Sequence, residues 1–355
     1  MQQGEPKYIR LYEALRDEII RGEWPAGMRL PSRRQVAQER GLSVVTVEHS
    51  YELLCQEGYA EARPRSGHFV TYRPSDGFAA AEAPVRVRPN ADASGAGEER
   101  FPFSVLARAM RKVLSDYGEA ILDKAPNAGC HSLRQALSRY LARNRGIHAE
   151  PAQIVIGAGA EYLYGLVVEM LGNDRVFAIE FPSYEKIEQV YRARGVACKL
   201  LPLGKDGIRS SALWDTRATV LHITPFRSFP SGVTASASKR AEYVRWAAGE
   251  GRCIVEDDFE SEFSLLRKPE ETVFALSDRE NVIYLNTFSR TVSSSLRVGY
   301  MVLPRTLLDR FEARVGFYSC TVPAFEQYVL AELINSGDFE RHINRIRRRK
   351  RKGEI

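Results

Sequence analysis

Two hydrophobic patterns divide this chain. Near the start, apolar residues recur at helical spacing through Tyr8–Arg21 and then stop at Gly22–Gly27. After about residue 98, short apolar runs alternate with helix-length amphipathic segments. The predicted strands are Gln153–Gly157, Arg175–Glu180, Thr219–Ile223, Cys253–Glu256 and Val282–Leu285. Apolar strands separated by helices favour an α/β fold with a mostly parallel sheet covered on both faces.

A stretch rich in Ala, Gly, Pro and Ser separates the two patterns and carries no apolar period. We therefore expect three parts: a small, mainly helical domain at 1–74, a linker at 75–98 and a larger α/β domain at 99–355. A domain of the larger size can hold a hydrophobic core without disulfides.

The first domain contains two further helical segments joined by a short turn. Ser32 is placed to cap a helix that ends near Arg40, and Ser43 is placed to cap the next one. In that second helix the side chains predicted to point largely outward are Val44, Thr46, Glu48 and Ser50. Alternation in Ala60–Val70, around a basic tip, predicts a short hairpin. These elements predict a winged helix-turn-helix.

Positions 8–71 resemble the GntR family of bacterial regulators. The shared motifs are Leu30-Pro31-Ser32 with Arg34, Ser43-x-x-Thr46-Val47, Leu54 with Glu57-Gly58, and Gly67-x-Phe69-Val70. The resemblance implies binding to a double-stranded DNA operator. The predicted contact residues are Arg33, Arg34, Ser43, Val44, Thr46, Arg63, Arg65, Gly67 and His68. The family usually has arginine where this chain has Val44, a change expected to weaken phosphate attraction. The alternative is a winged helix that binds protein.

The larger domain resembles fold-type I pyridoxal-phosphate enzymes, and specifically the MocR branch, in which a GntR-type winged helix is joined to an aminotransferase-like domain. The resemblance runs from Phe101 to the end; its motifs are Phe101-Pro102-Phe103, Leu133-Arg134, Ile156–Glu161, Pro182-Ser183-Tyr184, Thr224–Gly232, Glu256–Phe263, Thr287–Thr291 and Leu296–Tyr300. It implies a three-layer α/β/α domain and a homodimer. Because the family's C-terminal segment is longer, we expect the small subdomain to be incomplete.

The same resemblance implies a pocket for pyridoxal 5′-phosphate. Its positions are Ala158, Gly159, Ala160, Tyr184, Asp257, Phe259, Thr287, Arg290 and Arg297. Asp257 matches the carboxylate that holds the pyridine nitrogen protonated, and Tyr184 matches the ring that stacks on the cofactor. Thr287 and Arg297 match phosphate contacts. Arg290 stands where the family has the lysine that attaches the cofactor covalently, and a guanidinium stays protonated and cannot replace that amine.

Three further changes fall in the predicted pocket. Phe259 stands in place of a tyrosine, Ala158 in place of a hydroxyl residue, and Glu161 where the MocR branch favours glutamine. A carboxylate beside the phosphate position opposes binding of a dianion. We therefore predict that covalent cofactor binding is lost and that Arg290 pairs with Asp257. The alternatives are another anion held by Arg290 and Arg297, such as a nucleotide phosphate or an organic acid, and noncovalent pyridoxal phosphate.

Composition adds modest constraints. The net charge of +6 permits a nucleic-acid partner, and the five widely spaced cysteines lack zinc or disulfide spacing, which favours a reducing compartment. No apolar run approaches the roughly 20 residues of a membrane span, so we predict a cytoplasmic location without membrane contact. The six histidines lack metal-ligand spacing, so no metal site is predicted.

The function favoured by these patterns is that of a non-enzymatic, DNA-binding transcription regulator. Its second domain would supply dimerisation and the response to a small anionic effector. One alternative is a regulator that still binds pyridoxal phosphate through another lysine, such as Lys186. The second alternative is an active aminotransferase that carries a DNA-binding domain.

Overall fold

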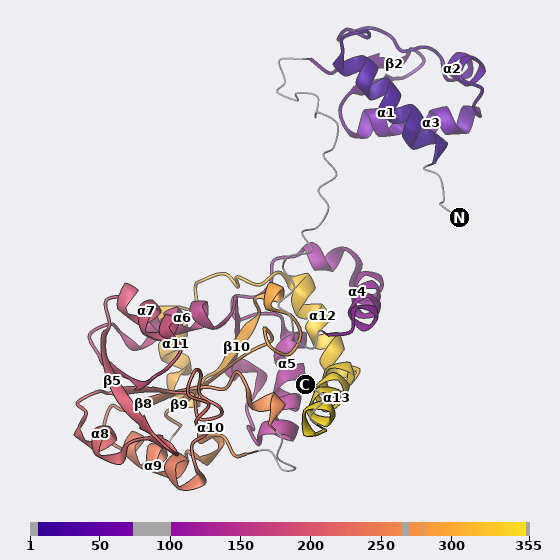
Figure 1. The fold of residues 1–355 in the computed structure, drawn as a ribbon. Helices are drawn as coiled ribbons and strands as arrows, with labels where there is room; N and C mark the ends of the chain where they lie inside the picture. Colours follow the sequence, from indigo (N-terminus) through magenta and orange to yellow (C-terminus); the bar gives the residue numbers. More distant parts are fainter. Residues whose placement is uncertain (1–5, 74–100, 265–269, 279, 353–355) are drawn as a thin grey trace. The chain divides into compact units, whose positions relative to one another are not determined.

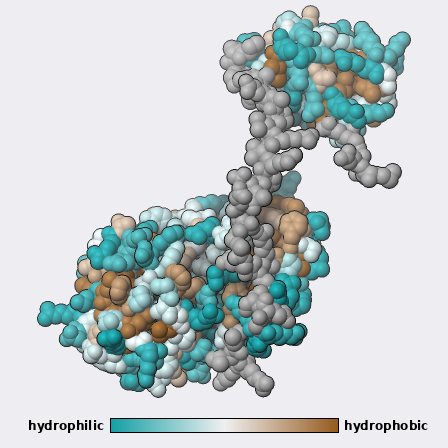
Figure 2. Space-filling model, in the orientation of Figure 1, coloured by the Kyte–Doolittle hydropathy of each residue, from teal (hydrophilic) through white to brown (hydrophobic). Residues whose placement is uncertain are grey.

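The computed structural model describes residues 6–73, 101–264, 270–278 and 280–352, which fall into two compact units (Figure 1). The linker predicted at 75–98 lies outside the described residues. On the face drawn in Figure 2, hydrophilic residues predominate on the first unit, whereas the second unit mixes hydrophilic and apolar patches. No helix in the described ranges has both the length and the apolar character needed to span a membrane.

The first unit is a three-helix winged helix-turn-helix. Its elements are α1 (Lys7–Ile20), α2 (Arg33–Glu39), α3 (Val44–Gln56), β1 (Ala60–Arg63) and β2 (Gly67–Val70). Both predicted caps are confirmed, because Ser32 Oγ accepts from the Gln35 amide and Ser43 Oγ accepts from the Thr46 amide. The two strands pair antiparallel, with Arg63 opposite Gly67.

The core of the first unit forms where α1 packs on α3. Its buried apolar residues include Leu11, Leu15, Val36, Val47, Tyr51 and Leu54. The expectation that Ser50 points outward is wrong, since Ser50 is fully buried and its hydroxyl lies 2.8 Å from the Tyr8 carbonyl oxygen and 2.9 Å from the Thr46 carbonyl oxygen, which share its one donor hydrogen. Its hydroxyl is small enough to fit between the helices, and both carbonyls satisfy it.

The second unit is built on an eight-stranded sheet of order β3-β10-β9-β8-β7-β4-β5-β6. The strands are β3 (Ile154–Gly157), β4 (Val176–Phe181), β5 (Ala197–Gly204), β6 (Gly207–Ile208), β7 (Val220–Ile223), β8 (Cys253–Asp257), β9 (Val282–Thr287) and β10 (Gly299–Val302). The consecutive pairs from β9 to β5 are parallel, whereas β10 is antiparallel to both neighbours and β6 is antiparallel to β5. The predicted mostly parallel sheet and its five predicted strands are confirmed.

Helices cover both faces of this sheet. They are α4 (Phe103–Tyr117), α5 (His131–Arg145), α6 (Ala160–Leu171), α7 (Glu185–Ala193), α8 (Ser210–Asp215), α9 (Ala237–Ala247), α10 (Val273–Leu276), α11 (Leu308–Arg314), α12 (Ala324–Asn335) and α13 (Asp338–Arg351). In β3, Ile154 and Ile156 join the core under α5 and α12, whereas Val155 joins the core under α6 and α7. This alternation follows from strand geometry and produces the predicted three-layer α/β/α architecture.

Candidate functional site

The start of α3 offers an exposed surface on the first unit. The side chains of Val44 and Val45 are 42% and 59% exposed, although both are apolar. Thr46 is half-buried, and its hydroxyl lies 2.8 Å from that of Ser43. The cap therefore holds the first turn of α3 rigid while leaving two apolar side chains outside. Methyl groups of this kind are suited to contact a thymine methyl in a major groove.

The two arginines at the start of α2, next to α3, differ in whether their charge is paired. Arg33, the first residue of α2, forms an ion pair with Glu48 of α3, so part of its positive charge is cancelled. Arg34 is exposed and has no ion-pair partner within the described chain. Of the two predicted arginines on α2, Arg34 is therefore the one fully available to an anionic partner.

The hairpin tip adds a second basic element. Arg65 lies in the turn between β1 and β2 with a positive φ of 61° and an exposed side chain. Arg63 pairs with Glu61, and its guanidinium carbon lies 4.4 Å from the ring centroid of Phe69. A Cβ added to Gly67 would lie 3.1 Å from Arg29 Nε, so Arg29 approaches the hairpin closely. Sequence reasoning missed Arg29, because only the fold brings this loop residue to the wing.

The side chain of His68 is half-buried. Its ring packs edge-on against Tyr51, with centroids 4.9 Å apart, and its pKa is lowered by burial and by the nearby Arg33. The imidazole therefore joins the wing to the core of the unit. Its predicted contact with DNA remains a prediction.

A cavity of about 220 Å³ lies in the second unit, where β4, β7, β8 and β9 end. The carboxyl ends of parallel strands are the usual place for a binding site in an α/β fold. Its walls include Ala160, Glu161, Tyr164, Tyr184, Ile187, Thr224, Phe229, Asp257, Phe259, Thr287, Ser289, Arg290 and Arg297. Seven of the nine predicted pocket residues are thus brought together, while Ala158 and Gly159 lie in the loop before α6.

Asp257 lies at the end of β8 and is 3% exposed. Its Oδ2 accepts a short hydrogen bond from the Tyr164 hydroxyl and lies 3.8 Å from His222 Nε2. The other ring nitrogen of His222 is 2.7 Å from the Tyr191 hydroxyl. Oδ1 of Asp257 is buried and has no hydrogen-bond partner in the described part of the protein. A buried, unsatisfied carboxylate oxygen on a cavity wall calls for a donor.

His222 belongs to this site, although no motif marked it. It is fully buried on β7, in the otherwise apolar run Val220–Ile223. The sequence could have pointed to His222, because it is a single polar residue within a predicted buried strand. A buried polar group of this kind needs a hydrogen-bond partner.

The predicted ion pair between Arg290 and Asp257 is wrong. Arg290 Nη2 instead donates to Glu260 Oε1 at 2.6 Å, and the other oxygen of Glu260 lies 3.8 Å from Arg227 Nε. Among the described residues, Asp257 accepts its hydrogen bond from Tyr164, and His222 Nε2 lies 3.8 Å away without a hydrogen-bond partner of its own. The physical reason is that Glu260, three residues beyond Asp257, provides a carboxylate closer to position 290.

Glu161 also lines the cavity, in the first turn of α6. Its Oε1 lies 2.9 Å from Lys186 Nζ and its Oε2 lies 2.9 Å from Arg297 Nη2. The hydrogen bond from Lys186 is the main reason why the pKa of Glu161 is lowered, and Arg297 adds to it. Glu161 is therefore a carboxylate ion that joins the two cations, Lys186 and Arg297.

The backbone amides just before α6 are hydrogen-bonded within the protein. The Ala158 amide donates to Thr321 Oγ1 at 3.1 Å, and the Gly159 amide donates to the Gly157 carbonyl at 2.8 Å. Gly159 has a φ of 84°, and a Cβ there would lie 3.3 Å from Arg297 Nη2. The glycine thus lets Arg297 lie directly against the loop.

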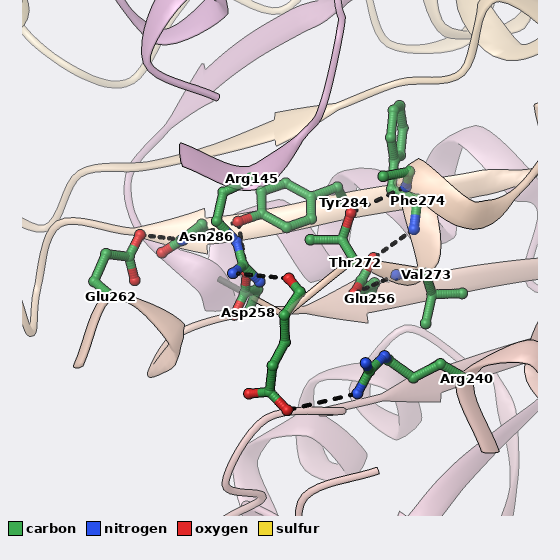
Figure 3. Close-up of polar contacts among 12 residues, drawn as sticks. Arg145, Arg240, Glu256, Asp258, Glu262, Thr272, Val273, Phe274, Tyr284 and Asn286 are labelled. Carbon is green, nitrogen blue, oxygen red and sulfur yellow. Dashed lines mark hydrogen bonds and ion pairs between the residues drawn. The ribbon is translucent and has the colours of Figure 1, made fainter. Parts of the chain in front are cut away.

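A buried polar network supports the other face of β8 (Figure 3). Glu256 accepts from the amides of Val273 and Phe274, at 2.9 and 2.8 Å. Asp258 accepts from Arg145 at 2.6 Å and from the Tyr284 hydroxyl at 2.7 Å. Because neighbouring strand residues face opposite ways, this network holds β8 in place while Asp257 faces the cavity.

The fold and site together define a class: a winged helix-turn-helix regulator with an aminotransferase-like domain. The family model "Bacterial regulatory proteins, gntR family" matches residues 7–70, and "Aminotransferase class I and II" matches residues 95–352. The uncharacterized HTH-type transcriptional regulator YdeL of Bacillus subtilis (strain 168) is 31% identical over 98% of this chain and 77% of its own length. The chain belongs to the MocR/PdxR group of GntR-type transcriptional regulators, which carry this aminotransferase-like domain.

Two other relatives extend the same pattern. The probable rhizopine catabolism regulatory protein MocR of Rhizobium meliloti is 28% identical over 97% of this chain and 74% of its own length. The HTH-type pyridoxine biosynthesis transcriptional regulator PdxR of Corynebacterium glutamicum is 26% identical over 97% of this chain and 77% of its own length. The relatives are named as regulators, although the domain has the fold of an enzyme.

Solved aminotransferases resemble the second unit. Kynurenine aminotransferase of Pyrococcus horikoshii, solved with PMP, matches 70% of this chain with 25% identity and a TM-score of 0.64. The α-aminoadipate aminotransferase LysN of Thermus thermophilus, solved with N-(5′-phosphopyridoxyl)-L-leucine, matches 70% of it with 27% identity and a TM-score of 0.62. This chain spans 64% of the length of each of these enzymes.

Proposed function

We propose that this protein is a cytoplasmic transcription regulator that binds an operator in double-stranded DNA as a homodimer. Residues 1–74 would bind DNA, 75–98 would link the domains, and 99–355 would provide dimerisation and sense a small ligand. The observation that carries the DNA-binding proposal is the joint exposure of the α3 start, Arg34 and the hairpin tip at Arg65. A recognition helix beside a basic wing is the arrangement that reads DNA.

The proposed DNA contacts fall into two groups, those to phosphates and those to base edges. Arg34, Arg65 and Arg29 are suited to phosphates, while Val44 and Thr46 at the start of α3 are suited to base edges. Ser43 acts through its cap on α3, and Gly67 allows Arg29 to approach the wing. Phosphate contacts provide affinity for any sequence, so specificity would depend on the first turn of α3.

The test of this proposal is selection of bound duplexes from a random DNA pool by the full chain. We expect an enriched motif with two-fold symmetry, and an R34A variant should bind that motif more weakly. R21A is the matched control, because Arg21 is an exposed arginine of the same unit that follows α1 and pairs with Glu23. Failure to enrich any motif would contradict the proposal.

The homodimer proposal has support beyond the resemblance. Large apolar side chains are exposed on α4 and the turn after it: Phe103, Leu114, Tyr117 and Leu122. A contiguous exposed apolar patch is typical of an interaction surface, and we propose that these residues contribute to one. Light scattering of the purified protein should give twice the chain mass, and a monomer at micromolar concentration would contradict the proposal.

We further propose that the second domain does not catalyse transamination and does not attach pyridoxal 5′-phosphate. Arg290 occupies the position expected for the attaching lysine, and no lysine is among the described residues lining the cavity. Lys186, the rival candidate, has its pKa raised by its hydrogen bond to Glu161. A protonated amine bound to a carboxylate is a poor nucleophile. The cavity wall at Asp257 suits a pyridine nitrogen. At Arg297, which matches a phosphate contact of the family, the carboxylate of Glu161 is already present.

A further inference from the structure

The cavity wall presents two different chemical environments. At the end of β8, Asp257 Oδ1 is buried without a hydrogen-bond donor among the described residues. At the start of α6, Arg297 and Lys186 are already joined by the carboxylate of Glu161. We propose that the effector is a flat nitrogen heterocycle that carries an N–H donor and no phosphate. This inference rests on the proposed sensor function and names the ligand class of that site.

The donor requirement follows from the surroundings of Asp257. Its Oδ2 is occupied by Tyr164, and the guanidinium of Arg290 is directed to Glu260. A protonated ring nitrogen placed against Oδ1 would satisfy the free oxygen and form a charge-assisted hydrogen bond. A neutral hydrocarbon ring would leave that oxygen unsatisfied.

The shape requirement follows from the aromatic walls. Tyr164, Tyr184, Phe229 and Phe259 all line the cavity, and the rings of Tyr184 and Phe229 meet edge-on with centroids 6.4 Å apart. Rings of this kind favour stacking on another planar ring. A cavity of about 220 Å³ is small and suits one ring with short substituents.

The exclusion of phosphate follows from Glu161. Its ionised carboxylate cancels one of the two positive charges on Lys186 and Arg297 and stands where a phosphate would contact them. The amides of Ala158 and Gly159 are hydrogen-bonded within the protein, so neither is available to an anion. Arg290 and Arg297, to which the sequence assigned an alternative anionic ligand, both have carboxylate partners.

Two ligands that differ only in the phosphate provide the test. Calorimetric titration of the full chain with pyridoxamine and with pyridoxamine 5′-phosphate should give tighter binding of pyridoxamine, by at least about tenfold. E161Q should reverse the order, since it removes the competing charge and leaves both cations. D257N should weaken both ligands at least about tenfold, with thermal melting used to verify folding. E188Q is the matched control, because Glu188 pairs with Arg192 on the same helix as Lys186 and does not line the cavity.

The outcomes separate this inference from the proposed function. Tighter binding of the phosphate ester to the wild-type chain, with no response to E161Q, would overturn the ligand class while leaving the sensor intact. Binding of neither ligand would overturn the inference as well as the sensor role. Selection from the DNA pool reports on the regulator proposal independently of both results.

Discussion

Arg65 combines an exposed guanidinium with a backbone conformation that favours glycine, since its φ is 61° at the hairpin tip. We expect R65G to change the free energy of unfolding by less than about 1 kcal/mol, because relief of left-handed strain is offset by the greater freedom of glycine in the unfolded chain. DNA affinity should nevertheless fall for every sequence. The slope of log K against log salt should become shallower by about 0.9 if one phosphate contact is lost.

Unfolding in urea and fluorescence anisotropy at several salt concentrations would measure these two effects. R21A, at the position that follows α1, serves as the control for removal of an exposed arginine elsewhere on the unit. An unchanged salt slope for R65G would show that Arg65 makes no phosphate contact.

The roles of some single residues could be predicted from the sequence, whereas the contacts of others could not. Ser32 and Ser43 were predictable as caps because a cap depends on its next three residues alone. The acceptor for Arg290 was not predictable, because Asp257 and Glu260 lie three residues apart and only side-chain geometry decides between them. The same holds for Arg29, which reaches the wing through the fold and through no local motif.

At the scale of elements, Glu48 links α3 to α2 through its ion pair with Arg33. We expect E48Q to strengthen binding to DNA of any sequence, because it releases the charge of Arg33 next to the duplex. The salt slope should steepen by about 0.9 for one additional phosphate contact. Anisotropy with a nonspecific duplex measures the change, and E52Q is the control, since Glu52 is an exposed residue of the same helix. Equal effects of both variants would indicate a general charge effect.

The end of α5 is tied to β8 by the buried ion pair of Arg145 with Asp258, whose side chains are 5% and 0% exposed. We expect R145M to lower the free energy of unfolding of the second unit by about 3–5 kcal/mol, because Asp258 would remain buried without its cation. R143M is the matched control on the same helix, where the pair with Glu340 is solvent-exposed and is worth less than about 1 kcal/mol. Urea unfolding of the full chain measures both, and similar losses would contradict this account of the network.

Strands that are marked by a run of apolar residues could be predicted from the sequence. Strands without such a run could not. The runs that became β3, β4, β7, β8 and β9 are buried and mostly apolar, as buried parallel strands are, with polar residues mainly near their carboxyl ends. β5 was missed because its burial alternates near the edge of the sheet. β10 is a short antiparallel strand inserted between β3 and β9, and its place depends on long-range pairing.

Across the whole second unit, burial raises the pKa of several carboxyl groups, including Glu180 and Glu256, each to about 7. A carboxyl group with a raised pKa in the folded state stabilises the fold at low pH and loses that contribution as pH rises through the folded value. We therefore expect the second unit to become less stable between about pH 5 and pH 8. Thermal melting across this range measures the trend.

A variant assigns part of this pH dependence to one group. E180Q should flatten the profile, because the amide keeps an acceptor for the Ser228 hydroxyl and cannot ionise. E188Q is the control, since Glu188 lies in a solvent-accessible ion pair. A profile that E180Q leaves unchanged would place the pH dependence elsewhere.

The central claim concerns the whole molecule: a regulator that uses an aminotransferase fold without attaching its cofactor. The most direct test is to incubate the native protein with pyridoxal 5′-phosphate, reduce it with borohydride and map modified peptides by mass spectrometry. R290K supplies a lysine at the position in question and is the positive control. We predict labelling at position 290 in R290K and only scattered, substoichiometric labelling of exposed lysines in the wild-type chain. Stoichiometric labelling of one wild-type lysine, such as Lys186, would contradict the account.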